Sequence, residues 1–380
     1  MAFSSIRLAV AGLTTVGLAV GALVTPTSAD AATAAPGAPI RTHPVETSLP
    51  NVPVELDAGM CSQGPVGMLT EGGQAPRPVM LTAGHCLLPM DPQWVPTHEV
   101  FVPRPDGDEL IGYRGEAKLI EPRETNVVDA AIDVALGADW GVVELNPGVS
   151  TTRMAQSVDR FGNPQGPGVE LTGIRDYPDL APYQISIDNF GQPICKDGTT
   201  SGRSCGTQLF RSQHMVYSYN LNYLKGDSGG INYDPNNGEV IGMTSQAFGS
   251  VGSASTADAA LQEAYGIPDG QVNDHFQLSE STEPHDTDFR TVNQDNEAGQ
   301  QWAQENLDVP DLSAELDKAV GEAQADAEQY AGQLTDQVTS GDFAGAEQTW
   351  NEATVTAQDH IDNIGPLGIA VGLEQLLEEF

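Results

Sequence analysis

Ser228 is the residue whose surroundings most clearly suggest chemistry. It lies in the glycine-rich stretch KGDSGG, residues 225–230, which fits the G-x-S-x-G pattern of serine nucleophiles. In the α/β enzymes that use this pattern, the serine sits between a strand and a helix. The residues that follow here, INYDPNNGEVIGMTS, form two strand-like runs around an Asn-Asn-Gly turn. The context therefore does not fit an esterase-type nucleophile turn, and it leaves an acidic surface turn and the nucleophile loop of a peptidase as alternatives.

A serine hydroxyl is a poor nucleophile at neutral pH, so Ser228 needs a base, and His85 is the candidate. A neutral imidazole takes the hydroxyl proton during attack and returns it to the leaving group. His85 ends the apolar run VMLTAGH and is followed by Cys86, which can pin the turn that carries it. A buried carboxylate must hold the imidazole in one tautomer. About a dozen aspartates lie between His85 and Ser228, so residue types alone leave the acid open.

The segments TAGHC and GDSGG together resemble the trypsin/chymotrypsin-like serine peptidases, whose chain order is His, Asp, Ser. Two further segments, GMCSQGPVG and ICKDGTTSGRSCGT, resemble the opening strand and a cysteine loop of the bacterial, streptogrisin-like branch of that family. The resemblance extends from about Asp57 to Gly249, roughly half of the chain, and leaves out the C-terminal third.

The resemblance implies a role for each matching residue. His85 is the base and Ser228 the nucleophile. Asp139, at the start of DWGVVEL, matches the catalytic acid, and Asp133 in DVALGAD matches less completely and is the alternative. The backbone N–H groups of Gly226 and Ser228 form the oxyanion hole, and Asp227 takes part in a buried ionic contact. The resemblance implies no cofactor and no metal ion.

Three residues are candidates for the substrate pocket: Asn222, Tyr223 and Ser245. Asn222 is six residues before Ser228, where trypsin-like enzymes carry an acid, so cleavage after Lys or Arg is not predicted. Tyr223 is bulky enough to fill the pocket. Ile231 also replaces the usual proline after GDSGG.

Four cysteines follow the N-terminal segment: Cys61, Cys86, Cys195 and Cys205. An even number in an oxidising compartment predicts two disulfides, and residue types alone allow three pairings. Metal ligation is the competing interpretation, but the spacings are not CxxC-like and no histidine cluster accompanies them. The resemblance implies the pairs Cys61–Cys86 and Cys195–Cys205.

The elements that must position these residues are short strands. Between residues 57 and 250, apolar runs alternate with turn clusters such as RPDGDE, LNPG and DPNNGE, which is typical of an all-β sandwich or barrel. We expect a mainly β fold of two antiparallel six-stranded β-barrels, as the resemblance implies. The first barrel should cover about 57–150 and the second about 165–250. Residues 32–56, rich in Ala, Pro and Thr, are predicted to be an extended leader.

The C-terminal third has a different composition. It contains 27 of the 53 acidic residues but only two basic ones, Arg290 and Lys318. We expect a polar linker at 251–300 and an acidic helical tail at 301–380, because apolar residues from Leu312 to Leu334 recur at steps of three and four. A second helix is expected from Phe343 to Ile361. The tail is either a solvated spacer, a docking module for a cell-envelope partner, or a cover over the active site.

Residues 1–31 have the layout of a secretory signal, with a basic start, an apolar stretch and an Ala-Asp-Ala step. A membrane anchor is the alternative, but Pro26 and several glycines and threonines make the stretch weaker than a bilayer span requires. A formal charge of −37 repels nucleic acid and anionic membranes, so we expect neither as a partner. The protein is predicted to be secreted, with or without association to the cell surface.

The sequence therefore favours a secreted serine endopeptidase that acts on peptide or protein substrates through a His85–Asp139–Ser228 acyl-enzyme mechanism. The alternative is a catalytically silent peptidase homologue that binds a partner or the cell envelope through its acidic helical tail.

Overall fold

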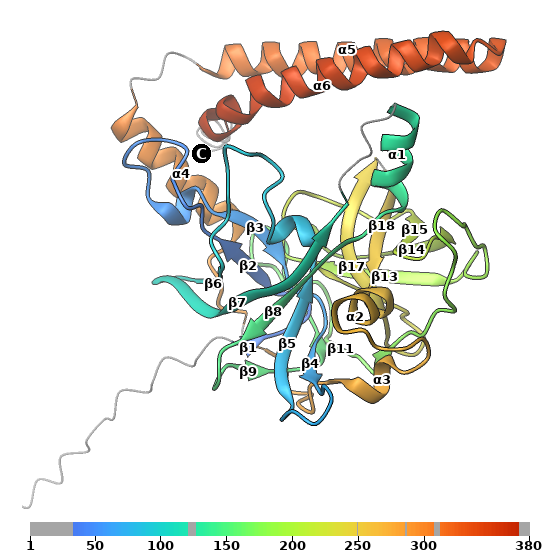
Figure 1. Ribbon diagram of the computed structural model, residues 1–380. Coiled ribbons are helices and arrows are strands. Elements are labelled where there is room, and N and C mark those ends of the chain that lie inside the picture. Colours follow the sequence, from blue (N-terminus) through green and yellow to red (C-terminus); the bar gives the residue numbers. More distant parts are fainter. Residues whose placement is uncertain (1–32, 121–126, 249, 286, 308–311, 372–380) are drawn as a thin grey trace, which may run out of the picture. The chain divides into compact units, whose positions relative to one another are not determined.

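The computed structural model describes residues 33–120, 127–248, 250–285, 287–307 and 312–371 (Figure 1). The predicted signal, residues 1–31, lies outside the described residues. The fold is mainly β, with two large sheets and six α-helices among the described residues.

The C-terminal sheet contains a closed barrel of six strands. Its strands follow the order β12-β17-β16-β13-β14-β15-β18, and an additional pairing of β17 with β18 closes the ring. The strands are β12 (Gly173–Ile174), β13 (Pro193–Gly198), β14 (Gly202–Arg211), β15 (Met215–Tyr219), β16 (Ile231–Tyr233), β17 (Glu239–Phe248) and β18 (Val251–Thr256).

The N-terminal sheet has eight strands in the order β19-β4-β5-β8-β7-β6-β2-β3. They are β2 (Pro39–Thr42), β3 (Gly59–Ser62), β4 (Val66–Leu69), β5 (Arg77–Thr82), β6 (Glu99–Arg104), β7 (Gly107–Leu119), β8 (Asp139–Leu145) and β19 (Phe276–Leu278). The pairings between its described strands leave β3 and β19 as edges. One of the two predicted six-stranded barrels is thus present as a closed ring, and the other half is a larger sheet.

Strands β2 and β19 come from segments that the sequence analysis placed outside the barrels. Part of the predicted leader forms β2, which pairs with β3 and β6. Within the predicted polar linker, β18 belongs to the closed barrel and β19 pairs with β4. Strands β2 and β19 have only four and three residues, so no apolar alternation is visible in their sequences. Tertiary contacts, rather than a local pattern, hold them in place.

The two sheets share a hydrophobic core. Leu81 and Trp140 of the N-terminal sheet belong to the same buried cluster as Ile231 and Met243 of the C-terminal sheet. Strand β8 lies between β5 and β7 and is buried along six of its seven residues, which explains its nearly continuous apolar sequence. The two sheets therefore meet across one continuous apolar cluster.

Small elements complete the domain. Strand β1 (Thr33–Ala34) pairs with β9 (Ser150–Thr151), and β10 (Met154–Ala155) pairs with β11 (Val169–Glu170). The helical elements are η1 (Val54–Leu56), η2 (Gly84–Cys86), α1 (Val127–Leu136), α2 (Ala257–Tyr265), α3 (Val272–His275) and α4 (Val292–Asn306). A capping box formed by Thr291 and Gln294 begins α4.

Two long helices follow, α5 (Leu312–Ser340) and α6 (Phe343–Val371), and they lie side by side as a hairpin (Figure 1). The Tyr330 hydroxyl is 3.0 Å from that of Thr356, and His360 Nε2 is 2.9 Å from an oxygen of Asp326. Gly341, with φ of +81°, makes the turn between them. Within the described part of the chain, no helix is both long enough and apolar enough to cross a bilayer.

Candidate active site

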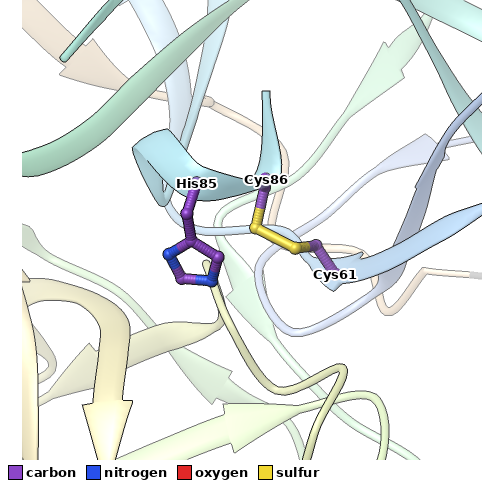
Figure 2. Close-up of side chains that lie close together, drawn as sticks. All are labelled: Cys61, His85 and Cys86. Carbon is purple, nitrogen blue, oxygen red and sulfur yellow. A yellow bond between two sulfur atoms is a disulfide. The ribbon is translucent and has the colours of Figure 1, made fainter. Parts of the chain in front are cut away.

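A short turn at the end of β5 carries His85. The turn η2 begins two residues after β5, and the disulfide Cys61–Cys86 fastens it to β3. Figure 2 shows the His85 ring beside this disulfide. A Cβ on Gly84 would lie 2.2 Å from the carbonyl oxygen of Lys118, so the turn packs directly on β7 and requires glycine.

Asp139, the first residue of β8, holds His85 by two hydrogen bonds. Its Oδ1 accepts from the His85 backbone N–H at 2.9 Å, and its Oδ2 is 2.8 Å from His85 Nδ1. An ionised carboxylate only accepts hydrogen bonds, so Nδ1 carries the proton and Nε2 of neutral His85 has a free lone pair. The Asp139 side chain is 2% exposed and that of His85 18%. This arrangement leaves a buried acid behind the ring and an accessible base on its other side.

The pKa values of this pair are shifted in opposite directions. Burial of Asp139 disfavours its charge, but the charge of His85 and hydrogen bonds from His85 and Ser245 outweigh burial, so the pKa of Asp139 is lowered. Burial also disfavours the charged form of His85, but the neighbouring Asp139 carboxylate outweighs it and the pKa of His85 is raised. Asp139 is therefore stabilised as the carboxylate. The raised pKa of His85 makes its imidazole a stronger base.

Asp133, the alternative acid, lies elsewhere in the structure. It belongs to α1, and its Oδ1 accepts a hydrogen bond from the Tyr183 hydroxyl at 3.0 Å. Of the two candidate acids, Asp139 is the one that the structure hydrogen-bonds to His85.

The loop that carries Ser228 is hydrogen-bonded to strands β3 and β17. The Ser228 carbonyl accepts from the N–H of Ser62 at 2.7 Å, next to the disulfide-bonded Cys61. The N–H of Gly229 donates to the Thr244 carbonyl at 2.7 Å, beside Ser245. A Cβ on Gly229, whose φ is +81°, would lie 2.0 Å from Thr82 Oγ1 at the end of β5. The loop therefore abuts the strand end that leads to His85.

The candidate nucleophile and the candidate base, Ser228 and His85, make no direct side-chain hydrogen bond in the described structure. Among the described residues, no hydrogen bond joins Ser228 Oγ to His85 Nε2. In substrate-free enzymes this bond is commonly long and tightens when substrate binds.

The backbone around Gly226 has the left-handed conformation that glycine allows. Its φ is +96°, and a Cβ there would lie 2.3 Å from Thr200 Oγ1. The Gly226 carbonyl accepts from the Ser62 hydroxyl at 2.7 Å. Within the described ranges, neither the N–H of Gly226 nor that of Ser228 donates a hydrogen bond to another protein group.

Asp227 is fully buried and forms an ion pair with Lys196 of β13, at 2.7 Å. It also accepts hydrogen bonds from the N–H groups of Leu224, Thr200 and Ser201 at 2.9 to 3.0 Å. Burial lowers the pKa of Lys196 in spite of the Asp227 charge. The sequence analysis expected an ionic contact for Asp227 but did not find Lys196. Its only signal was a lysine within the strand-like run PICKDG.

The three candidate pocket residues have different surroundings. Asn222 is exposed, and its N–H donates to the Ser204 hydroxyl at 3.0 Å. The Tyr223 hydroxyl is 3.0 Å from that of Ser218. Ser245, in contrast, donates its hydroxyl hydrogen bond to Asp139 Oδ2. Ser245 thus contacts the candidate catalytic acid, a role that the sequence analysis missed because residue type does not give a hydroxyl's direction.

The second disulfide joins Cys195 to Cys205, which face each other across β13 and β14. Both disulfides match the pairing that the resemblance implies. In the described part of the chain, Cys61, His85 and Cys86 form a group whose potential metal-ligand atoms all lie within 4.8 Å of one another. Because both sulfur atoms are in a disulfide, neither is available as a thiolate ligand.

Two cavities in the described structure lie away from these residues. One, of about 530 Å³, is lined by Ile185, Ile187, Phe190, Leu209 and Phe210. The other, of about 440 Å³, is polar and contains Arg175. His85, Asp139 and Ser228 line neither of them.

No protein-family model and no curated protein sequence matches the chain. Among solved structures, it is similar to Thermobifida fusca Protease A, with 18% identity, coverage of 66% of this chain and 100% of that one, and a TM-score of 0.39. Nocardiopsis protease has 15% identity, with coverage of 62% of this chain and 97% of that one, and a TM-score of 0.37. Cellulomonas bogoriensis chymotrypsin has 16% identity, with coverage of 62% of this chain and 96% of that one, and a TM-score of 0.36. At identities and TM-scores this low, the comparisons assign neither a family nor an activity to the chain.

Proposed function

We propose that this chain is a serine endopeptidase that hydrolyses peptide bonds through an acyl-enzyme intermediate. The observation that supports this most is the His85–Asp139 pair: a buried carboxylate binds both the backbone N–H and Nδ1 of one histidine. The Ser228 loop, fastened to β3 and to β17, supplies the nucleophile at the same corner.

In the proposed mechanism, His85 Nε2 takes the proton of Ser228 Oγ as that oxygen attacks the substrate carbonyl carbon. The negative charge on the carbonyl oxygen is held by the N–H groups of Gly226 and Ser228. Each such donor contributes about 3 kcal/mol of transition-state stabilisation. Protonated His85 then gives its proton to the leaving amine, and the acyl group remains on Ser228. A water molecule repeats the sequence, with His85 as base, and releases the acid. Asp139 stays ionised throughout, in keeping with its lowered pKa.

The ion pair of Asp227 with Lys196 has a separate part in this proposal. Asp227 is the residue between the two proposed oxyanion donors, so its contacts with Lys196, with the N–H groups of Leu224, Thr200 and Ser201, and with the Ser201 hydroxyl hold the loop that carries both donors. It takes no part in proton transfer.

We further propose a chymotrypsin-like domain of the streptogrisin-like branch that extends from about residue 33 to about residue 307. Secretion after cleavage of residues 1–31 belongs to the same proposal. The two disulfides are compatible with an oxidising, extracellular compartment. N-terminal sequencing of the secreted protein tests the cleavage site.

The acidic helical hairpin is proposed as a spacer or as a docking module for a cell-envelope partner. A truncation that tests its role has to keep β18, α2, β19 and α4, which contact the two sheets or β2. Removal of residues 308–380 meets that condition. Unchanged activity and unchanged surface retention would favour the spacer.

The activity itself is tested with Ser228→Ala. This variant should lose both peptide hydrolysis and labelling by a fluorophosphonate, whereas Ser250→Ala, at an exposed serine, should retain both. Labelling that survives in Ser228→Ala overturns the proposal. Wild-type protein with intact disulfides that neither labels nor hydrolyses peptides also overturns it and favours a silent homologue.

A further inference from the structure

Tyr223 precedes Ser228 by five residues, and its ring lies directly on bare backbone of the barrel wall. A Cβ added to Gly252 of β18 would be 2.2 Å from Tyr223 Cε2 and 2.5 Å from Cζ. A side chain at position 252 would not fit between the ring and the strand, so glycine at this position allows the ring to pack on the backbone. We call Gly252 the seat of the ring. Tyr223 also packs against a buried apolar cluster that includes Leu221 and Ile241.

The hydroxyl end of Tyr223 is fixed as well. It lies 3.0 Å from the hydroxyl of Ser218, a fully buried residue of β15. The Lys196 ammonium lies 5.7 Å from the ring centroid. Burial raises the pKa of Tyr223 to about 12, so the phenol stays neutral. If the ring swung outward, the buried Ser218 hydroxyl would lose this partner, which opposes the movement.

The position of this ring follows from the proposed chemistry. The oxygen of the attacked carbonyl lies at the N–H groups of Gly226 and Ser228, so the residue that contributes this carbonyl must lie against the loop from residue 222 to 228. The N–H of Gly229 donates to the Thr244 carbonyl of β17, so this loop and the pair β17–β18 bound the space beside the attacked residue. In that pair, Gly252 is opposite Ala247, two residues after Ser245, which binds Asp139. The Tyr223 ring, which belongs to the loop and contacts Gly252 of β18, bridges the same two elements.

We propose that Tyr223 fills the space for the side chain of the attacked residue, and that the chain therefore cleaves after residues with small side chains: glycine, alanine or serine. This proposal rests on the proposed peptidase function. It assigns Tyr223 as the residue that limits substrate size, with Gly252 as its seat.

The test compares wild-type protein with Tyr223→Ala, which opens the space, and with Tyr223→Phe, which keeps the ring and removes only the hydroxyl. The substrates are two peptides that differ only in the attacked residue, alanine or phenylalanine, and rates are normalised to Ser228 labelled by fluorophosphonate. Wild type and Tyr223→Phe should prefer alanine. In Tyr223→Ala, the ratio of kcat/KM for phenylalanine over alanine should rise about 100-fold.

A second measurement on wild-type protein keeps the test decisive if Tyr223→Ala does not fold. Cleavage of an unbiased peptide library should occur after small residues. Cleavage mainly after large residues, or an unchanged ratio in a Tyr223→Ala protein whose Ser228 is labelled, overturns this inference. Absence of Ser228 labelling in wild type instead overturns the proposed function.

Discussion

The ion pair between Lys196 and Asp227 gives the sharpest prediction about the loop that carries Ser228. Replacing Lys196 by methionine keeps the aliphatic bulk of the side chain but removes its charge. The Lys196 side chain is 0% exposed and that of Asp227 1%. The substitution therefore leaves a carboxylate buried without its cation, in the segment between the two proposed oxyanion donors.

The magnitude follows from burial. Removing one partner of a buried ion pair typically destabilises a protein by about 3–5 kcal/mol. Asp227 keeps hydrogen bonds from the N–H groups of Leu224, Thr200 and Ser201, which stabilise its charge. We therefore expect a loss near the lower end, about 3 kcal/mol. Because the loop would shift around the unpaired charge and displace the proposed oxyanion donors, kcat should fall more than KM rises.

The assay is a double-mutant cycle with Lys196→Met, Asp227→Asn and the combination, each followed by urea unfolding and by kcat/KM. The combined variant should be more stable than Lys196→Met, because it no longer buries an unpaired charge. A loss below about 1 kcal/mol in Lys196→Met with unchanged kcat, or a double variant no more stable than the single one, would refute this reasoning.

Three further predictions concern other parts of the molecule. Asp139→Asn should lower kcat by about 10⁴-fold with the fold intact, because the amide no longer fixes the His85 tautomer, while Asp133→Asn should keep activity; comparable losses in both would contradict the assignment of Asp139. Burial and the charges of Asp176, Asp269 and Asp179 raise the pKa of Asp258 from 3.8 to about 7, so the folded state loses stability as pH rises from about 4 to about 7. Asp258→Asn should remove this loss and raise Tm at pH 8 but not at pH 4, and calorimetry that finds the same difference at both pH values would disprove it. Arg41→Met should cost about 2 kcal/mol in urea unfolding, because buried Arg41 binds Asp295 of α4 at 2.7 Å while Asp295 keeps its second ion pair with Arg290; the exposed control Lys318→Met should change stability by less than about 0.5 kcal/mol.

Local motifs carried most of what the sequence could predict about the site. TAGHC and GDSGG place a histidine and a serine on turns whose glycines are required by close backbone contacts, as at Gly84 and Gly229. Because these requirements are local, they are visible in short stretches of sequence.

Contacts between distant segments could not be predicted in this way. Strand β2 lies in a segment whose sequence is typical of a leader, because the ion-pair partner of buried Arg41 is Asp295, 254 residues away. The pairs Lys196–Asp227 and Ser245–Asp139 likewise join residues that are 31 and 106 positions apart in the sequence. The N-terminal sheet likewise gains β19 from a segment that is polar in sequence. Residue type and spacing carry no information about such partners.

The central claim, that Ser228 is a nucleophile activated by His85, is tested most directly by mapping a covalent adduct. Wild-type protein should be treated with a fluorophosphonate, digested and analysed by mass spectrometry. The proposed mechanism predicts one adduct, on Ser228, and its loss in His85→Ala. An adduct on another residue, or no adduct in correctly folded wild-type protein, would contradict it.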